Sequence, residues 1–186
     1  MFTQNKSQLW AGLGLIAVIL LTRFNHFGSN VYLPDATLAV LFLGGILITR
    51  TSWLGLALIA AFGMDFYAMD VKGISDYCMS LGYWGLIPTY ALVWGAGRLL
   101  AKREQSFALV PYAISGWAAT SIAFVLSNSF WYAFSDKVAT LTIVEFIQHV
   151  AQYYTPYVGY ALMYLGIAWI AVRAARSLPG SRSAQA

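Results

Sequence analysis

The chain has 186 residues, of which 60% are hydrophobic and only 10% are charged. The apolar residues come in long runs without the wide polar gaps of a water-exposed helix, which indicates an integral membrane protein and excludes an ordinary soluble domain. So short a chain has no room for a sizeable soluble domain beside its membrane part. We therefore expect residues 1–186 to form one membrane domain.

Six segments are apolar enough to be membrane spans. A spanning helix needs about 20 apolar residues to cross a hydrocarbon core of about 30 Å. We expect an all-α protein with six transmembrane helices, at residues 8–24, 34–49, 52–69, 79–100, 107–127 and 154–174. The second segment is short, which favours a tilted or partly buried helix. The first shows no small-residue cleavage site of a signal peptide, so we expect it to remain as a helix.

The longest predicted connection, residues 128–153, lies between the fifth and sixth spans. Its second half, residues 142–150, has apolar residues at helical spacing. This pattern is typical of an amphipathic helix at the membrane surface, where it would act as a lid over the outer mouth of the bundle. A simple connector is the alternative.

Two pairs of glycines lie within predicted spans, Gly44-Gly45 in the second and Gly95-x-Gly97 in the fourth. Small residues let two helix backbones approach closely. The pairs would therefore permit either helix sliding or close static packing, and the sequence leaves both interpretations open.

Basic residues gather on one side of the six-span arrangement, which defines its orientation. Eight lie on one side, namely Lys6, Arg50, Arg98, Lys102, Arg103, Arg173, Arg176 and Arg182, and three on the other, Arg23, Lys72 and Lys137. The positive-inside rule then places both termini in the cytoplasm. The acidic residues lean toward the outer face, apart from Glu104. The net charge of +4 thus reflects membrane topology, and nucleic-acid binding is not needed to explain it.

Asp65 and Tyr83 are candidate binding residues near the outer face. Asp65 lies about one turn before the end of the third span, where an ionisable group is costly unless it faces a cavity or a partner. The alternative is a purely structural pair with Arg23 or a tyrosine. Tyr83 lies between Gly82 and Gly85, whose small side chains allow a large partner to approach, and its alternative is an ordinary interfacial tyrosine.

Cys78 is the only cysteine, and it lies in a short polar interval between two predicted spans. A helix beginning near Met79 would favour its thiolate, and no second cysteine is present for a disulfide. His26 and His149 show no paired spacing, which disfavours a four-ligand zinc site. A single thiolate suits a metal complex that brings most of its own ligands, such as a corrin or porphyrin. A small apolar filler is the alternative.

The sequences GMDF at residues 63–66 and DYCMSLGY at residues 76–83 resemble those of the BtuM-type bacterial cobalamin (vitamin B12) transporters. These are small six-helix proteins similar to the S-components of energy-coupling factor (ECF) transporters, and the resemblance covers essentially the whole chain. It implies an S-component-like bundle in the bacterial inner membrane that takes up cobalamin from the periplasmic side. In that family a cysteine is the axial cobalt ligand of base-off cobalamin. The resemblance therefore implies that Cys78 is the cobalt ligand and that Asp65 and Tyr83 lie near the same pocket. It also implies that Cys78 could assist the decyanation of cyanocobalamin.

The expected partners follow from motifs that the chain lacks. Many S-components dock onto their coupling module through an Ala-x-x-x-Ala repeat, whereas residues 11–17 here read AGLGLIA without that repeat. No phosphate-binding loop is present, so the chain would act alone or borrow a motor. A membrane assembly protein without a small-molecule ligand is the alternative function. An intramembrane enzyme is disfavoured, because neither His26 nor His149 has a Ser or Asp motif around it.

Overall fold

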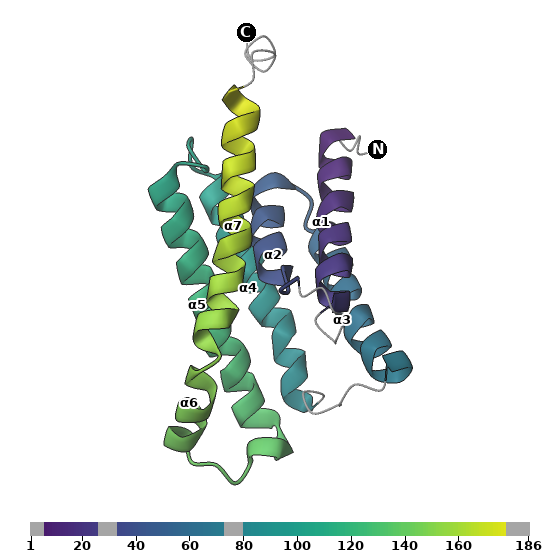
Figure 1. Ribbon diagram of the computed structural model, residues 1–186, viewed down its shortest axis with the longest axis vertical. Helices are drawn as coiled ribbons and strands as arrows, with labels where there is room; N and C mark the ends of the chain where they lie inside the picture. The colour runs from purple at the N-terminus through teal and green to yellow at the C-terminus, as the bar shows by residue number, and fades with distance from the viewer. Residues whose placement is uncertain (1–5, 26–32, 73–79, 178–186) are drawn as a thin grey trace.

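The computed structural model describes residues 6–25, 33–72 and 80–177, and every regular element in these ranges is a helix (Figure 1). The predicted all-α class is therefore confirmed. The helices are α1 (Lys6–Asn25), α2 (Thr37–Leu47), α3 (Ser52–Lys72), α4 (Leu86–Ala101), α5 (Leu109–Phe134), α6 (Ile143–Ala151) and α7 (Tyr154–Ser177), with 3₁₀ turns η2 (Leu81–Gly85) and η3 (Asp136–Val138). Each of the six predicted spans overlaps one of these helices, in chain order α1, α2, α3, α4, α5 and α7.

Three of the described helices are long and apolar enough to cross a membrane: residues Ser52–Val71 of α3, the whole of α5 and the whole of α7. Helices α2 and α4 are shorter, with 11 and 16 residues. Large apolar side chains cover much of the outer surface, and Trp10, Ile59 and Leu81 are 70% or more exposed. So large an apolar surface is unfavourable in water and suits a hydrocarbon environment.

Helix α2 lies at the centre of the bundle. Residues 37–45 are all buried, and the helix contacts α1, α3, α4, α5 and α7. Its sequence is apolar on every face, which is typical of a helix surrounded by others. The expectation of a partly buried second segment is thus consistent with its position.

Glycines bring α2 and α4 into backbone contact. A Cβ atom at Gly45 would overlap the carbonyl oxygen of Trp94, and one at Gly97 would overlap that of Phe42. A Cβ at Gly95, on the same helix as Gly97, would meet nothing within 4 Å. Close static packing therefore accounts for Gly45 and Gly97.

Helix α5 continues to Phe134, beyond the predicted end at residue 127. The polar residues that suggested a helix end bond back to the carbonyl groups of their own helix. Asn128 Nδ2 donates to Phe124 O at 2.8 Å, and Ser129 Oγ donates to Val125 O at 2.7 Å. Such bonds satisfy short polar side chains without ending a helix.

The fourth long helix begins later than predicted, at Leu86 and not at residue 79. Residues 81–85 form the turn η2, in which Gly82 and Gly85 pack against Phe130 of α5. A side chain at either glycine would overlap that residue. Close packing on α5 thus shapes this stretch.

The short helix α6 forms within the predicted connection. Thr142 and Glu145 close a capping box at its start, and Phe146 and Val150 pack onto Phe124 and Val138.

The first residue of α1 and the last of α7 lie at one end of the bundle, which we call the terminal end (Figure 1). Helix α6 and η3 lie at the opposite end.

Candidate functional site

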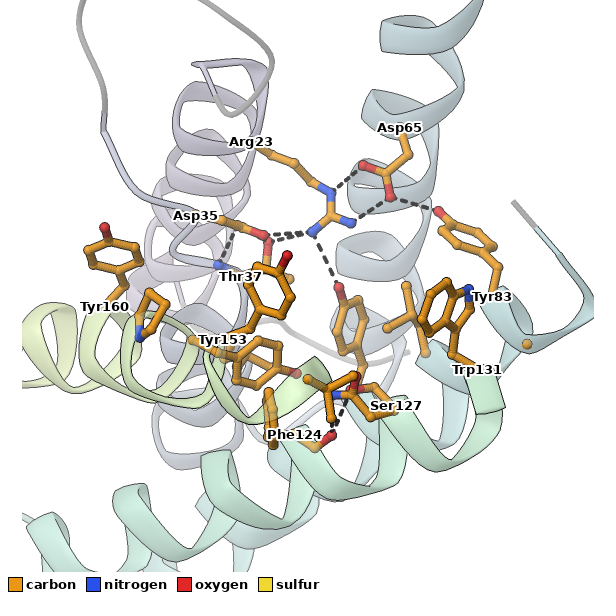
Figure 2. Close-up of a pocket in the computed structure, with 18 of the residues that line it drawn as sticks. Arg23, Asp35, Thr37, Asp65, Tyr83, Phe124, Ser127, Trp131, Tyr153 and Tyr160 are labelled. Carbon is orange, nitrogen blue, oxygen red and sulfur yellow. Dashed lines mark hydrogen bonds and ion pairs between the residues drawn. The ribbon is translucent and has the colours of Figure 1, made fainter. Parts of the chain in front are cut away.

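A cavity of about 680 Å³ lies at the α6 end of the bundle and is partly open to its surroundings (Figure 2). All the long helices and α6 contribute residues to its wall. The lining residues are Arg23, Asp35, Thr37, Leu38, Asp65, Met69, Gly82, Tyr83, Leu86, Tyr90, Phe124, Ser127, Asn128, Trp131, His149, Val150, Tyr153, Pro156, Tyr157 and Tyr160. Its volume lies within the range of small-molecule pockets, about 300–1,000 Å³.

A buried ion pair joins α1 to α3 in the cavity wall. Arg23 Nε donates to Asp65 Oδ1 at 2.7 Å, and the NH2 group donates to Oδ2 at 2.5 Å. The two residues are 7% and 8% exposed. This bidentate geometry fixes both side chains, because the planar guanidinium matches the two carboxylate oxygens.

The same guanidinium also contacts α2 and α4. Its NH1 group donates to Asp35 Oδ2 at 2.9 Å, to Thr37 Oγ1 at 3.2 Å and to Tyr90 OH at 3.2 Å. Asp35 Oδ1 accepts bonds from the N–H and hydroxyl of Thr37, which fixes the first turn of α2. One positive charge thus lies between two carboxylates, as Figure 2 shows, and the amide end of α2 helps to stabilise Asp35.

Tyr83 completes this network by donating from its hydroxyl to Asp65 Oδ2 at 2.7 Å. Its ring packs against Phe62, with centroids 5.3 Å apart. We call Arg23, Asp35, Thr37, Asp65, Tyr83 and Tyr90 the Arg23 network. The predicted residues Asp65 and Tyr83 therefore meet in one cavity wall, and the structural pairing weighed for Asp65 is present with both kinds of partner. A ligand contact by either residue stays a prediction, and Cys78 lies outside the described residues.

Aromatic side chains form the opposite wall: Phe124, Trp131, Tyr153, Tyr157 and Tyr160, which we call the aromatic wall. Three of these tyrosines recur at i, i+4 and i+7, namely Tyr153 just before α7 and Tyr157 and Tyr160 within it, so they share one helix face. This spacing is visible in the sequence and could have predicted a shared tyrosine face. His149 also lines the cavity and contacts Tyr153 edge-on, with ring centroids 6.2 Å apart.

Sequence reasoning missed the cavity roles of Asp35, Thr37, Tyr90 and His149. Asp35 carried a local signal, since an acidic residue just before an apolar run often caps a helix. Tyr90 carried none, because it joins the network through a guanidinium 67 positions earlier in the chain.

In the described part of the chain, no group of three or more His, Cys, Asp or Glu side chains could hold a metal ion. No protein-family model matches the sequence, and no curated protein matches it significantly. The class that fold and site define is therefore a helical protein with three helices of membrane-spanning length and a polar-aromatic cavity at one end.

Proposed function

We propose that this protein takes up cobalamin across the bacterial inner membrane. The observation that carries the proposal is the cavity in which Asp65 and Tyr83 meet, lined also by Gly82, four residues after Cys78. Consecutive Cα atoms are about 3.8 Å apart, so Cys78 is within about 15 Å of Gly82 along the chain. The motif that resembles the cobalamin transporters thus borders this cavity.

The arrangement in the membrane is six spans with both termini in the cytoplasm. The start of α1 and the end of α7 lie at the same end of the bundle, as an even number of crossings requires (Figure 1). Helices α1, α2 and α4 lie alongside the three longer helices and would cross with them. The terminal end carries most of the basic residues, so the cavity would open toward the periplasm.

The cavity offers suitable chemistry for a corrinoid. The aromatic wall provides flat apolar surface for the corrin ring, and Ser127, Asn128 and His149 provide polar groups for its amide side chains. Cobalamin is larger than a drug-sized ligand, so it would fill the cavity and extend through its open side. Among the described residues, Asp65 Oδ1 accepts one bond, from Arg23, so a second acceptor position would take an amide N–H of the substrate.

Cys78 would coordinate cobalt in the lower axial position vacated by the dimethylbenzimidazole base. A thiolate donor there weakens the bond to the upper ligand opposite. In cyanocobalamin, cyanide would leave as the anion with its bonding electron pair. External thiols would reduce Co(III) to Co(II), with two thiols oxidised to one disulfide for every two cobalt ions reduced. The residues of this chain bind and orient the corrinoid, and they provide no electron of their own.

For energy coupling, the protein would either act alone or dock onto an ECF module. The chain lacks the strict small-residue repeat for docking onto an ECF module, which favours a protein that acts alone. Cobalamin uptake by cells that lack other importers, measured with and without an ECF module, distinguishes the two.

The visible absorption spectrum of bound cobalamin tests the proposal. Wild-type protein and the Cys78→Ala variant are saturated with cobalamin, freed of unbound substrate and compared. Cobalt ligation predicts different spectra, because a thiolate ligand changes the electronic transitions of the corrin. Identical spectra would reject ligation by Cys78, and a wild-type protein that stays colourless would favour the assembly-protein alternative.

A further inference from the structure

A second, smaller hollow of about 400 Å³ lies between α5 and α7, which pack side by side (Figure 1). We call it the α5–α7 groove. Helix α5 contributes Tyr112, Ile114 and Trp117, and α7 contributes Leu165, Gly166 and Trp169. It extends over residues 109–117 of α5, or about 12 Å along the helix.

The groove presents a hydrocarbon-like surface. The hydroxyl of Tyr112 donates to Leu165 O at 3.0 Å, and the indole N–H of Trp169 donates to Phe107 O at 3.0 Å. These two polar groups therefore bond within the protein, and the remaining lining is mostly aliphatic and aromatic. Ile114 and Trp117 are 58% and 52% exposed at the rim. An occupant of the groove therefore has to be apolar along this length.

The end of the groove nearest the terminal end is positively charged. The guanidinium of Arg173 lies 5.6 Å from the ring centre of Trp169, and that of Arg176 lies 5.5 Å from the ring centre of Phe107. Phe107 stacks on Tyr112 at 5.4 Å. Two exposed arginines are thus held at the mouth of an apolar groove.

Nearby sequence adds to this charge. The turn between α4 and α5 contributes Lys102 and Arg103, against the single acid Glu104. Basic residues near the cytoplasmic surface attract anionic lipids, and arginine forms strong charge-assisted hydrogen bonds to phosphate.

We propose that the α5–α7 groove binds one anionic phospholipid, with an acyl chain between the two helices and its phosphate at Arg173 and Arg176. Charge complementarity at the mouth selects this occupant over a neutral lipid or an apolar helix. The site is separate from the cavity, and the proposal does not depend on cobalamin binding.

Gly166 provides a variant that fills the groove. A Cβ at this position meets nothing within 4 Å, so a leucine side chain in Gly166→Leu begins in open space and would occupy the groove. Gly159→Leu is the matched control, because its Cβ also meets nothing within 4 Å and it lies on the same helix outside the groove. The headgroup variant is the double change Arg173→Gln and Arg176→Gln, and Lys6→Gln on α1 is its control.

Native mass spectrometry of the full chain, titrated with phosphatidylglycerol or with phosphatidylcholine of the same acyl chains, tests the site. We expect one tightly retained phosphatidylglycerol on the wild type and on both controls, and at least tenfold weaker binding to Gly166→Leu. Removal of two arginines should weaken binding about 25-fold, at about fivefold for each charge near the surface. Equal retention of the two lipids, or undiminished binding by Gly166→Leu, would overturn the proposal. Loss of a dimer in Gly166→Leu with unchanged lipid binding would assign the groove to a second copy of the chain.

Discussion

Arg23 connects four helices through one guanidinium group. It bonds to Asp65 of α3, to Asp35 and Thr37 at the start of α2, and to Tyr90 of α4. A buried ion pair contributes little net stability compared with an apolar pair of the same volume. Removal of one partner is nonetheless strongly destabilising, because the other charge stays buried. The Arg23 network thus fixes the shape of the cavity wall.

Substitution of Asp65 by Asn tests this role. Among the described residues, Asp35 then remains as the only carboxylate beside Arg23, so we expect a loss of about 3–5 kcal/mol in the free energy of unfolding. Thermal and denaturant unfolding in detergent measures it. Asp70→Asn, on an exposed position of the same helix, is the control and should leave stability unchanged. An Asp65→Asn protein as stable as the wild type would mean that the pair does not hold the helices together.

Sequence reasoning reached part of this network. The depth of Asp65 in an apolar run was enough to identify it as a residue that needs a partner, and Arg23 was one of the partners considered. The meeting of four helices was not predictable, because the pair joins residues 42 positions apart and depends on tertiary packing. Cys78 stays a prediction from sequence.

At the scale of helices, the contact of α2 with α4 determines how deeply α2 is buried. Gly45 and Gly97 allow carbonyl groups of the facing helix to lie where a side chain would otherwise be. Such contact leaves no space for an added methyl group. The two helices therefore form a closely packed pair beneath the cavity.

Gly97→Ala should force the two helices apart. We expect destabilisation of about 1–3 kcal/mol from overpacking. Gly95→Ala adds the same methyl group to the same helix in open space, and it should be neutral or stabilising by up to about 1 kcal/mol. Unfolding of the two variants under identical conditions gives the comparison. Equal stability of both would show that the close contact is not present in the membrane.

The capping box of α6 predicts a dependence on pH. Hydrogen bonds from the Thr142 hydroxyl and backbone N–H lower the pKa of Glu145. Because the pKa of Glu145 is lowered in the folded state, its ionised carboxylate stabilises α6 at pH values above the ordinary pKa of glutamate. This contribution is lost as the pH falls through the lowered value.

Hydrogen exchange of the α6 amides, corrected for the intrinsic effect of pH, measures this dependence. We expect protection of the first turn to fall in the acid range for the wild type and to stay flat for Glu145→Gln. Thr140→Ala, a nearby exposed change, should follow the wild type. If protection of the first turn also fell in the acid range for Glu145→Gln, the pH dependence would come from a group other than Glu145.

Helix existence was predictable where apolar runs were long, but helix ends were not. The sequence at residues 127–129 resembles a loop, and only the bonds back to α5 carbonyls explain why the helix continues. The late start of α4 depends on the contact of Gly82 and Gly85 with α5, which no local pattern encodes. Tertiary packing decided both ends.

For the whole molecule, the two ends of the bundle differ in charge and shape. The terminal end carries most of the basic residues, and the opposite end carries the cavity and most of the acids. This asymmetry is the physical basis for the orientation that we propose, because basic segments remain in the cytoplasm.

Reporter fusions test the orientation. A fluorescent protein at the C-terminus should be fluorescent, since its chromophore forms in the cytoplasm, and alkaline phosphatase there should be inactive. Phosphatase inserted at Thr140, between η3 and α6, should be active. The reverse pattern would place the cavity on the cytoplasmic side and contradict uptake from the periplasm.

The most direct test of cobalamin binding uses the single cysteine of the chain, because a thiol reagent then reports on Cys78 alone. Membrane vesicles are labelled with and without saturating cobalamin. A cysteine introduced by Ala139→Cys into the Cys78→Ala protein is the control, and its labelling should not change. We predict rapid labelling of Cys78 in empty vesicles and strong protection by cobalamin. Equal labelling of Cys78 in both would contradict cobalt ligation at this residue.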